Sequence, residues 1–197
     1  MPRNKKHTTD LFRIADSQQG YFTSGQAKEA GYDPRNATYH VRNGNWIRER
    51  RGIYRLQNYP VSRDGELVVW SLWSRNQDEV PQGVYSHQSA LAIHDLTDLM
   101  PAKYHMTVPL TFRRTAQIPK ALVLHPARLK AEEIEEKQGF AVTAPLRTIK
   151  DLIAENSVTI DTIRQALETA LRRGILTTRT IQEDQSQEMR QLLRSVG

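Results

Sequence analysis

Two short helix-forming segments separated by a glycine turn constrain the N-terminal fold more than any other feature. The first begins after Thr23, which has the spacing of a capping box with Gln26, and Gly31 supplies its stop. The second begins at Asp33-Pro34, an N-cap followed by proline at the first helical position, and is expected to cover residues 34–43. A short helix, a tight turn and a second helix predict a helix-turn-helix.

A β-hairpin is predicted directly after the second helix. Two runs rich in strand-forming residues, within 45–56, flank Arg51-Gly52. A further helix is expected upstream, with its cap at Thr8 or Thr9 and its end before Gly20. Residues 1–60 therefore predict a winged helix-turn-helix in which the hairpin is the wing.

The positive charge is concentrated in the same segment. The chain has 197 residues, with 28 Lys+Arg and 22 Asp+Glu, a net charge of +6. Residues 1–60 contain 11 basic and five acidic residues, and the rest of the chain is balanced. A solvated surface would explain such an excess equally well, but together with the order of elements it favours a DNA-binding module.

Candidate DNA contacts follow from the faces of these elements. Ala37 and Val41 are four residues apart and are expected to face inward. The outward residues of the second helix are then Arg35, Asn36, Thr38, Tyr39, Arg42 and Asn43. Arginine and asparagine pair with bases in the major groove, whereas threonine and tyrosine more often contact phosphates. An alternative places Tyr39 in the core, and His40 is expected to be packed rather than to contact bases.

Further phosphate contacts are expected from two neighbouring elements. Ser24 and Gln26 lie at the N-terminus of the first helix of the motif, where backbone amides attract anions. Arg48, Arg50 and Arg51 cluster at the tip of the wing.

Residues 61–197 predict a second, mixed α+β domain. Helices are expected over 66–74, from Ser86 to Ile93, over 145–155, 160–173 and 182–195, and strands over 84–86, 104–108, 121–125 and 140–143. The fold class is therefore α+β: an N-terminal winged helix-turn-helix over 1–60 followed by a mixed α+β domain with C-terminal helices over 61–197.

The second domain offers little recognisable chemistry. The absence of cysteine excludes disulfides, thiol catalysis and cysteine-ligated metals. His94-Asp95 is a fragment of a metal-hydrolase motif without further partners, and the acidic run 132–137 indicates a solvated helix or loop. His87, His105 and His125 are isolated in the sequence. We therefore expect no catalytic residues, no metal site and no cofactor, and hence a protein that is not an enzyme.

The protein is expected to be cytoplasmic and not associated with a membrane. No apolar run approaches the ~18 residues of a membrane span, and the basic N-terminus is not followed by the apolar stretch of a signal peptide.

The chain resembles the AbiEi antitoxin family of abortive-infection, type IV toxin–antitoxin systems. The resemblance is carried by the wing run 44–56 and, further along, by Ser86–Leu91 with His94-Asp95-Leu96, Met106–Pro109 and Thr143–Leu152. Together with the N-terminal winged helix that the wing run completes, these stretches span roughly residues 10–155. The family pattern usually has larger aliphatic residues near Ala37 and Asn45, which this sequence lacks.

The resemblance implies an antitoxin that also represses transcription of its own two-gene operon. The winged helix would bind double-stranded DNA at inverted repeats in its promoter, with a dimer as one arrangement. The partner would be a nucleotidyltransferase toxin encoded nearby, without a tight complex. The role would be phage defence, and the C-terminal domain of such proteins is associated with antitoxicity.

Two alternatives stay open at the level of the sequence. One is a winged-helix regulator whose C-terminal domain senses a partner or ligand, which a small-molecule pocket would favour. The other is a nuclease targeted by the winged helix, which would require a strand-borne Asp…Glu-x-Lys set.

Overall fold

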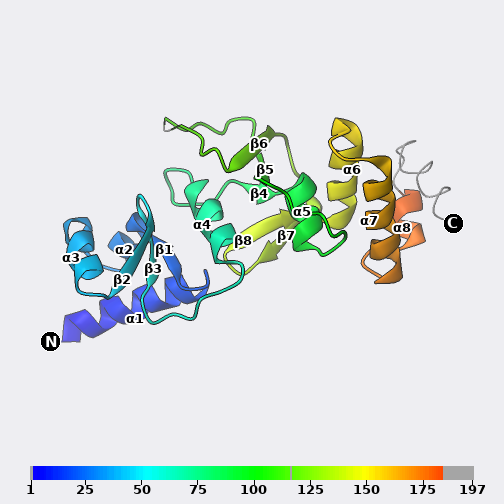
Figure 1. Cartoon of the computed structure of the whole chain (residues 1–197). Helices are drawn as coiled ribbons and strands as arrows, with labels where there is room; N and C mark the ends of the chain where they lie inside the picture. The colour runs from blue at the N-terminus through cyan, green and yellow to red at the C-terminus, as the bar shows by residue number, and fades with distance from the viewer. Residues whose placement is uncertain (1, 116, 184–197) are drawn as a thin grey trace. The chain divides into compact units, whose positions relative to one another are not determined.

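The computed structural model describes residues 2–115 and 117–183. The chain forms two compact units (Figure 1). The first comprises residues 1–83 with 136–140, and the second comprises residues 84–135 with 141–197.

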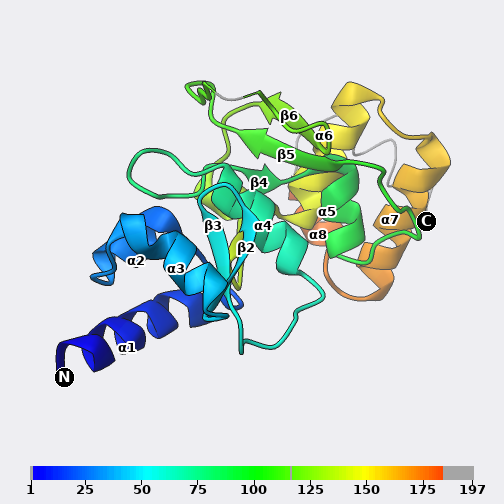
Figure 2. The same ribbon diagram turned by 60° about the vertical axis from the view of Figure 1, so that its left-hand side comes forward.

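The first unit contains a winged helix-turn-helix. Its elements are α1 (Pro2–Asp16), β1 (Tyr21–Thr23), α2 (Ser24–Glu29), the 3-10 turn η1 (Pro34–Asn36), α3 (Ala37–Arg42), β2 (Trp46–Arg50), β3 (Ile53–Leu56) and α4 (Gly65–Trp73). The strands form an antiparallel sheet in the order β1-β3-β2. Figure 2 shows α2 and α3 beside the hairpin β2–β3, which is the wing.

Two helices of this unit differ from the sequence prediction. The first helix begins at Pro2, not at Thr8 or Thr9. The predicted helix over 34–43 is divided into η1 and α3, because Asn36 N–H donates to the carbonyl of Asp33, and Ala37 N–H to that of Pro34. These bonds span three residues, which is the spacing of a 3-10 turn rather than an α-helix.

A small apolar core joins the helices to the wing. Its buried members are Leu11, Ala15, Phe22, Ala27, Ala30, Trp46 and Tyr54. Helix α4 belongs to the same unit: the Arg50 guanidinium lies 3.8 Å from the ring centroid of Trp70, and the Tyr21 hydroxyl lies against Gly65. The compact unit therefore extends beyond residue 60, where the sequence predicts a domain boundary.

The second unit is built on a mixed five-stranded sheet in the order β6-β5-β4-β8-β7, of which residues 136–140 belong to the first unit. Strand β4 pairs antiparallel with β5 and parallel with β8, and β5 pairs parallel with β6. The strands are β4 (Val84–Tyr85), β5 (Tyr104–Val108), β6 (Leu122–Pro126), β7 (Ile134–Lys137) and β8 (Phe140–Thr143), with a 3-10 turn η2 at Ala131–Glu133. The helices are α5 (His87–Ile93), α6 (Pro145–Glu155), α7 (Ile160–Arg172) and α8 (Thr178–Glu183).

The helices of this unit share one core. It contains Leu91, Leu96, Ile149, Leu152, Ile163, Ala166, Leu167, Ala170, Leu176 and Ile181. The overall class is α+β, as the sequence predicts. The predicted last helix over 182–195 lies almost entirely outside the described residues, in which α8 ends at Glu183.

The acidic run 132–137 is only in part the predicted helix or loop, since residues 132 and 133 lie in η2. Residues 134–137 form strand β7 at the edge of the sheet beside β8. Backbone pairing with β8 overrides the weak strand propensity of glutamate and lysine, and edge strands tolerate charged side chains. None of the helices in the described part of the chain has the length and hydropathy needed to cross a bilayer.

Candidate nucleic-acid interface

The first helix of the motif is fixed by its N-terminal cap. Gln26 N–H donates to Thr23 Oγ1 over 3.0 Å, and Thr23 N–H donates to Gln26 Oε1 over 2.9 Å. This is the predicted capping box. After Ala30 the chain turns through Gly31, whose φ of 93° favours glycine, so the helix ends where the sequence predicts.

The exposed face of the second helix matches the prediction. Arg35, Asn36, Thr38, Tyr39, Arg42 and Asn43 are all exposed, on η1, α3 and the residue that follows. Ala37 and Val41 are half-buried and pack against the core. Tyr39 is 61% exposed, which rejects the alternative that places it in the core.

His40 connects this helix to the wing. Its ring stacks on Trp46 with the centroids 4.4 Å apart, and Tyr32 meets it edge-on at 5.1 Å. Burial lowers the pKa of His40 below its usual value. His40 is therefore a packed residue, as predicted, and it holds the orientation of α3.

Arg35 forms an exposed ion pair with its neighbour Asp33. Its guanidinium donates to both carboxylate oxygens of Asp33, over 2.7 to 3.1 Å, while its side chain is 89% exposed. The side-chain hydrogen bonds from Arg35, followed by the backbone one, lower the pKa of Asp33 to about 2. An exposed pair of this kind is weak, so Arg35 is free to exchange Asp33 for another partner.

The three wing arginines have different surroundings. Arg48 and Arg51 are exposed on β2 and at the turn. Arg50 is also exposed at the side chain but lies over Trp70 of α4. Arg55 on β3 pairs with Glu49 at 3.0 Å and contributes to the wing itself rather than to a ligand surface.

The start of α2 does not present the open anion site expected from Ser24 and Gln26. The Gln26 amide bonds reciprocally to Gln18, at 3.1 and 3.0 Å, in addition to capping the helix. The Ser24 N–H donates to the carbonyl of Gly52, and the Glu79 carboxylate accepts from Thr23 Oγ1 at this helix end. An internal carboxylate thus occupies the position expected for a phosphate, and we leave Ser24 and Gln26 out of the proposed interface.

The histidines that are isolated in the sequence meet in the second unit. His125 Nε2 lies 3.0 Å from His105 Nδ1, and the rings of His87 and His125 stack with centroids 3.8 Å apart. The sequence signal was weak because these residues lie on α5, β5 and β6, which only the sheet brings together. His94 is separate from them and lies 2.8 Å, through Nε2, from the carbonyl of Thr143.

The nuclease alternative requires an Asp…Glu-x-Lys set on strands, and the structure places only the Glu-x-Lys part on a strand. Glu135 and Lys137 have Glu-x-Lys spacing on β7, contrary to the predicted helix or loop. Its neighbour β8 has the sequence Phe-Ala-Val-Thr and supplies no carboxylate.

These elements define the first unit as a winged helix-turn-helix, a fold common among DNA-binding regulators. Residues 10–57 match the family described as "Transcriptional regulator, AbiEi antitoxin". The resemblance is confirmed over these residues, and the match supports a role as an antitoxin-type transcriptional regulator. The later stretches of the resemblance, up to residue 155, lie outside the matched segment.

Other comparisons add little. The crystal structure of the RV2827C protein from Mycobacterium tuberculosis is 14% identical, with a TM-score of 0.45, over 100% of this chain and 78% of that chain. A similarity of this size supports no inference about function. No curated protein matches the chain.

Proposed function

We propose that the protein is the antitoxin of a type IV toxin–antitoxin system and that it also represses its own operon by binding DNA. The family match over residues 10–57 supports the regulatory role. On this proposal the protein is a regulator rather than an enzyme. It acts with a nucleotidyltransferase toxin encoded nearby, without a tight complex, in phage defence in the cytoplasm.

The observation that carries the DNA-binding part is the exposed face of η1 and α3. Arg35, Asn36 and Arg42 project from a helix whose opposite side is packed on the core. Arginine and asparagine have the donor and acceptor geometry for guanine and adenine edges in the major groove. The basic excess of residues 1–60 supplies the attraction to phosphates.

The wing would contact the backbone of the same DNA site. Arg48 and Arg51 are exposed, and neither is drawn into the core of the unit. Binding to inverted repeats would need two copies related by a two-fold axis, with half-sites about one or more helical turns apart.

The experiment separates repression from antitoxicity in the full-length protein. The neighbouring toxin gene is expressed from an unrelated promoter, together with wild-type protein or with an R35A/N36A variant. A reporter fused to the protein's own promoter is measured in parallel. We expect wild type to restore growth and repress the reporter, and the variant to restore growth while the reporter stays active.

Three results would contradict the proposal. Failure of wild-type protein to restore growth would reject the antitoxin function, and failure to repress the reporter would reject autorepression. Co-elution of wild-type protein and toxin at low concentration would reject the expected absence of a tight complex. An R13A variant is the matched control, because Arg13 is also exposed and paired with a nearby aspartate, at 3.6 Å, but lies on α1.

A second candidate function is a regulator whose second unit senses a ligand. It is favoured by a cavity of about 280 Å³ in that unit, whose lining includes the polar residues His87, His125 and Asp151.

A further inference from the structure

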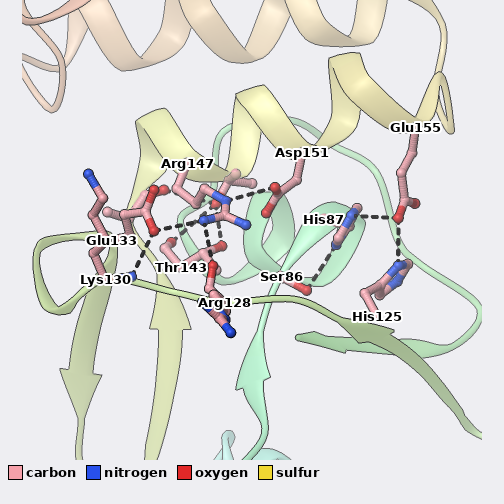
Figure 3. A network of polar contacts seen from close by, with 12 residues as sticks. Ser86, His87, His125, Arg128, Lys130, Glu133, Thr143, Arg147, Asp151 and Glu155 are labelled. Atoms are coloured by element: carbon pink, nitrogen blue, oxygen red, sulfur yellow. Dashed lines mark hydrogen bonds and ion pairs between the residues drawn. The ribbon is translucent and has the colours of Figure 1, made fainter. Parts of the chain in front are cut away.

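Two histidines and a glutamate converge at one end of the sheet in the second unit (Figure 3). Glu155 Oε1 lies 2.8 Å from His125 Nδ1 and 3.2 Å from His87 Nε2. The three residues come from the C-terminal end of α6, from β6 and from the start of α5. Their ligand atoms all lie within 4.8 Å of one another, although no segment shorter than 69 residues contains them all.

These distances suit a tetrahedral metal ion. Zinc binds imidazole nitrogen and carboxylate oxygen at about 2.0–2.2 Å, which places two ligand atoms of a tetrahedron roughly 3.4 Å apart. The separations of 2.8 and 3.2 Å are within about 0.6 Å of this value, and the stacked rings of His87 and His125, with centroids 3.8 Å apart, must turn apart so that both nitrogens point at the ion. Two histidines and one glutamate form a known ligand set of open zinc sites.

Both imidazoles have partners that can fix the tautomer a metal requires. His87 Nδ1 lies 2.9 Å from Ser86 Oγ, so its N–H can donate there while Nε2 binds the ion. His125 Nε2 can donate in the same way to His105 Nδ1 at 3.0 Å. Such outer hydrogen bonds are typical of metal-bound histidines.

The site opens into the cavity of about 280 Å³. Two buried oxygens of its lining residues, Thr107 Oγ1 and Asp151 Oδ2, have no hydrogen-bond partner within the described residues. The other oxygen of Asp151 accepts from Arg147 Nε at 2.7 Å. Buried polar atoms are normally hydrogen-bonded, so these two oxygens are available to a ligand or a metal-bound water in the cavity.

The backbone of His87 supplies an independent sign of constraint. This residue has a φ of 53°, in the left-handed region that a non-glycine residue seldom adopts, and only 3% of it is exposed. A strained backbone persists where surrounding structure requires it, and such residues cluster at functional sites.

We propose that His87 Nε2, His125 Nδ1 and a Glu155 carboxylate oxygen bind one transition-metal dication of the zinc class, with a fourth position open to the cavity. Imidazole donors favour zinc and its neighbours over magnesium and calcium, which prefer all-oxygen sites. The proposal is independent of DNA binding and antitoxicity. It differs from the sequence expectation that the protein has no metal site.

The test is titration of chelator-treated, full-length protein with Zn²⁺ by calorimetry, with Mg²⁺ as the contrasting ion. We expect one Zn²⁺ per chain, no comparable binding of Mg²⁺, and a higher melting temperature with zinc. H125Q and E155Q should each weaken zinc binding by at least tenfold. The H7Q variant, which removes a histidine of the first unit, should bind like wild type.

A second measurement distinguishes the proposed four-coordinate site from loose binding of metal by histidines alone. Co²⁺ added to wild type should give the intense visible absorption of four-coordinate cobalt, and E155Q should lose it. Because Glu155 is 42% exposed at its side chain, E155Q is expected to fold, which its melting curve without metal verifies. Wild type that binds no zinc, or E155Q and H125Q that bind as tightly as wild type, would overturn the proposal.

Discussion

His40 lies almost flat against Trp46, with the ring planes inclined by 22° and the centroids 4.4 Å apart. The contact joins α3 to the first residue of β2, so the helix that carries the proposed base contacts and the wing are oriented by one stacked pair. The half-buried position of the imidazole disfavours its charged form, which is the physical reason for the lowered pKa of His40.

The first prediction concerns the pH dependence of stability. Because the pKa of His40 is lower in the folded than in the unfolded state, the unfolded state binds more protons below pH ~6.5. The contribution of His40 is fully present above this pH and is lost as the pH falls towards its folded pKa. An H40F variant keeps an aromatic ring on Trp46 and should lose less stability than wild type between pH 7 and 5, measured by urea unfolding. Equal losses in the two proteins would contradict the prediction.

The second prediction separates capping from DNA contact at Gln26. Replacing Gln26 by alanine removes half of the capping box and the amide pair with Gln18, and should lower the free energy of unfolding by about 1 kcal/mol. The affinity of the folded variant for DNA should match that of wild type. A large loss of DNA affinity without a loss of stability would return Gln26 to the interface.

The third prediction concerns base recognition by η1. R35A or N36A should weaken binding to the operator by about 1–3 kcal/mol and relax the preference at one base position each. Competition binding against a set of single-base operator variants measures this. R13A, on α1, should leave the preference unchanged, and a uniform loss over all sequences would place these residues on phosphates instead.

The fourth prediction compares two neighbouring arginines of the wing. R51A should weaken binding to all sequences alike and make the slope of log K against log [salt] shallower by about 0.9, the value for one phosphate contact. R50A should in addition destabilise the first unit by about 0.5–1 kcal/mol, because Arg50 stacks on Trp70. Salt-dependent binding and urea unfolding of both variants test this, and identical stabilities would argue against the stacking.

Local signals in the sequence were sufficient for the winged helix. Thr23 and Gln26 form the predicted capping box, Gly31 ends α2, and Arg51-Gly52 forms the turn between β2 and β3. These features depend on residues within about four positions of one another, where backbone hydrogen bonding and glycine geometry dominate. The outward residues of α3 followed from the same reasoning, because helical periodicity alone separates them from Ala37 and Val41.

Only the tertiary structure decided the remaining features, because they depend on residues far apart in the chain. The Glu79 carboxylate lies at the start of α2, although Glu79 is more than fifty residues further along the chain. Residues 134–137 of the acidic run form a strand because they pair with β8. His87, His125 and Glu155 meet because β4, β5 and β6 pair in one sheet while α5 and α6 pack on each other. No local periodicity encodes such an encounter: the sequence determined the winged helix-turn-helix, and long-range packing created the candidate metal site.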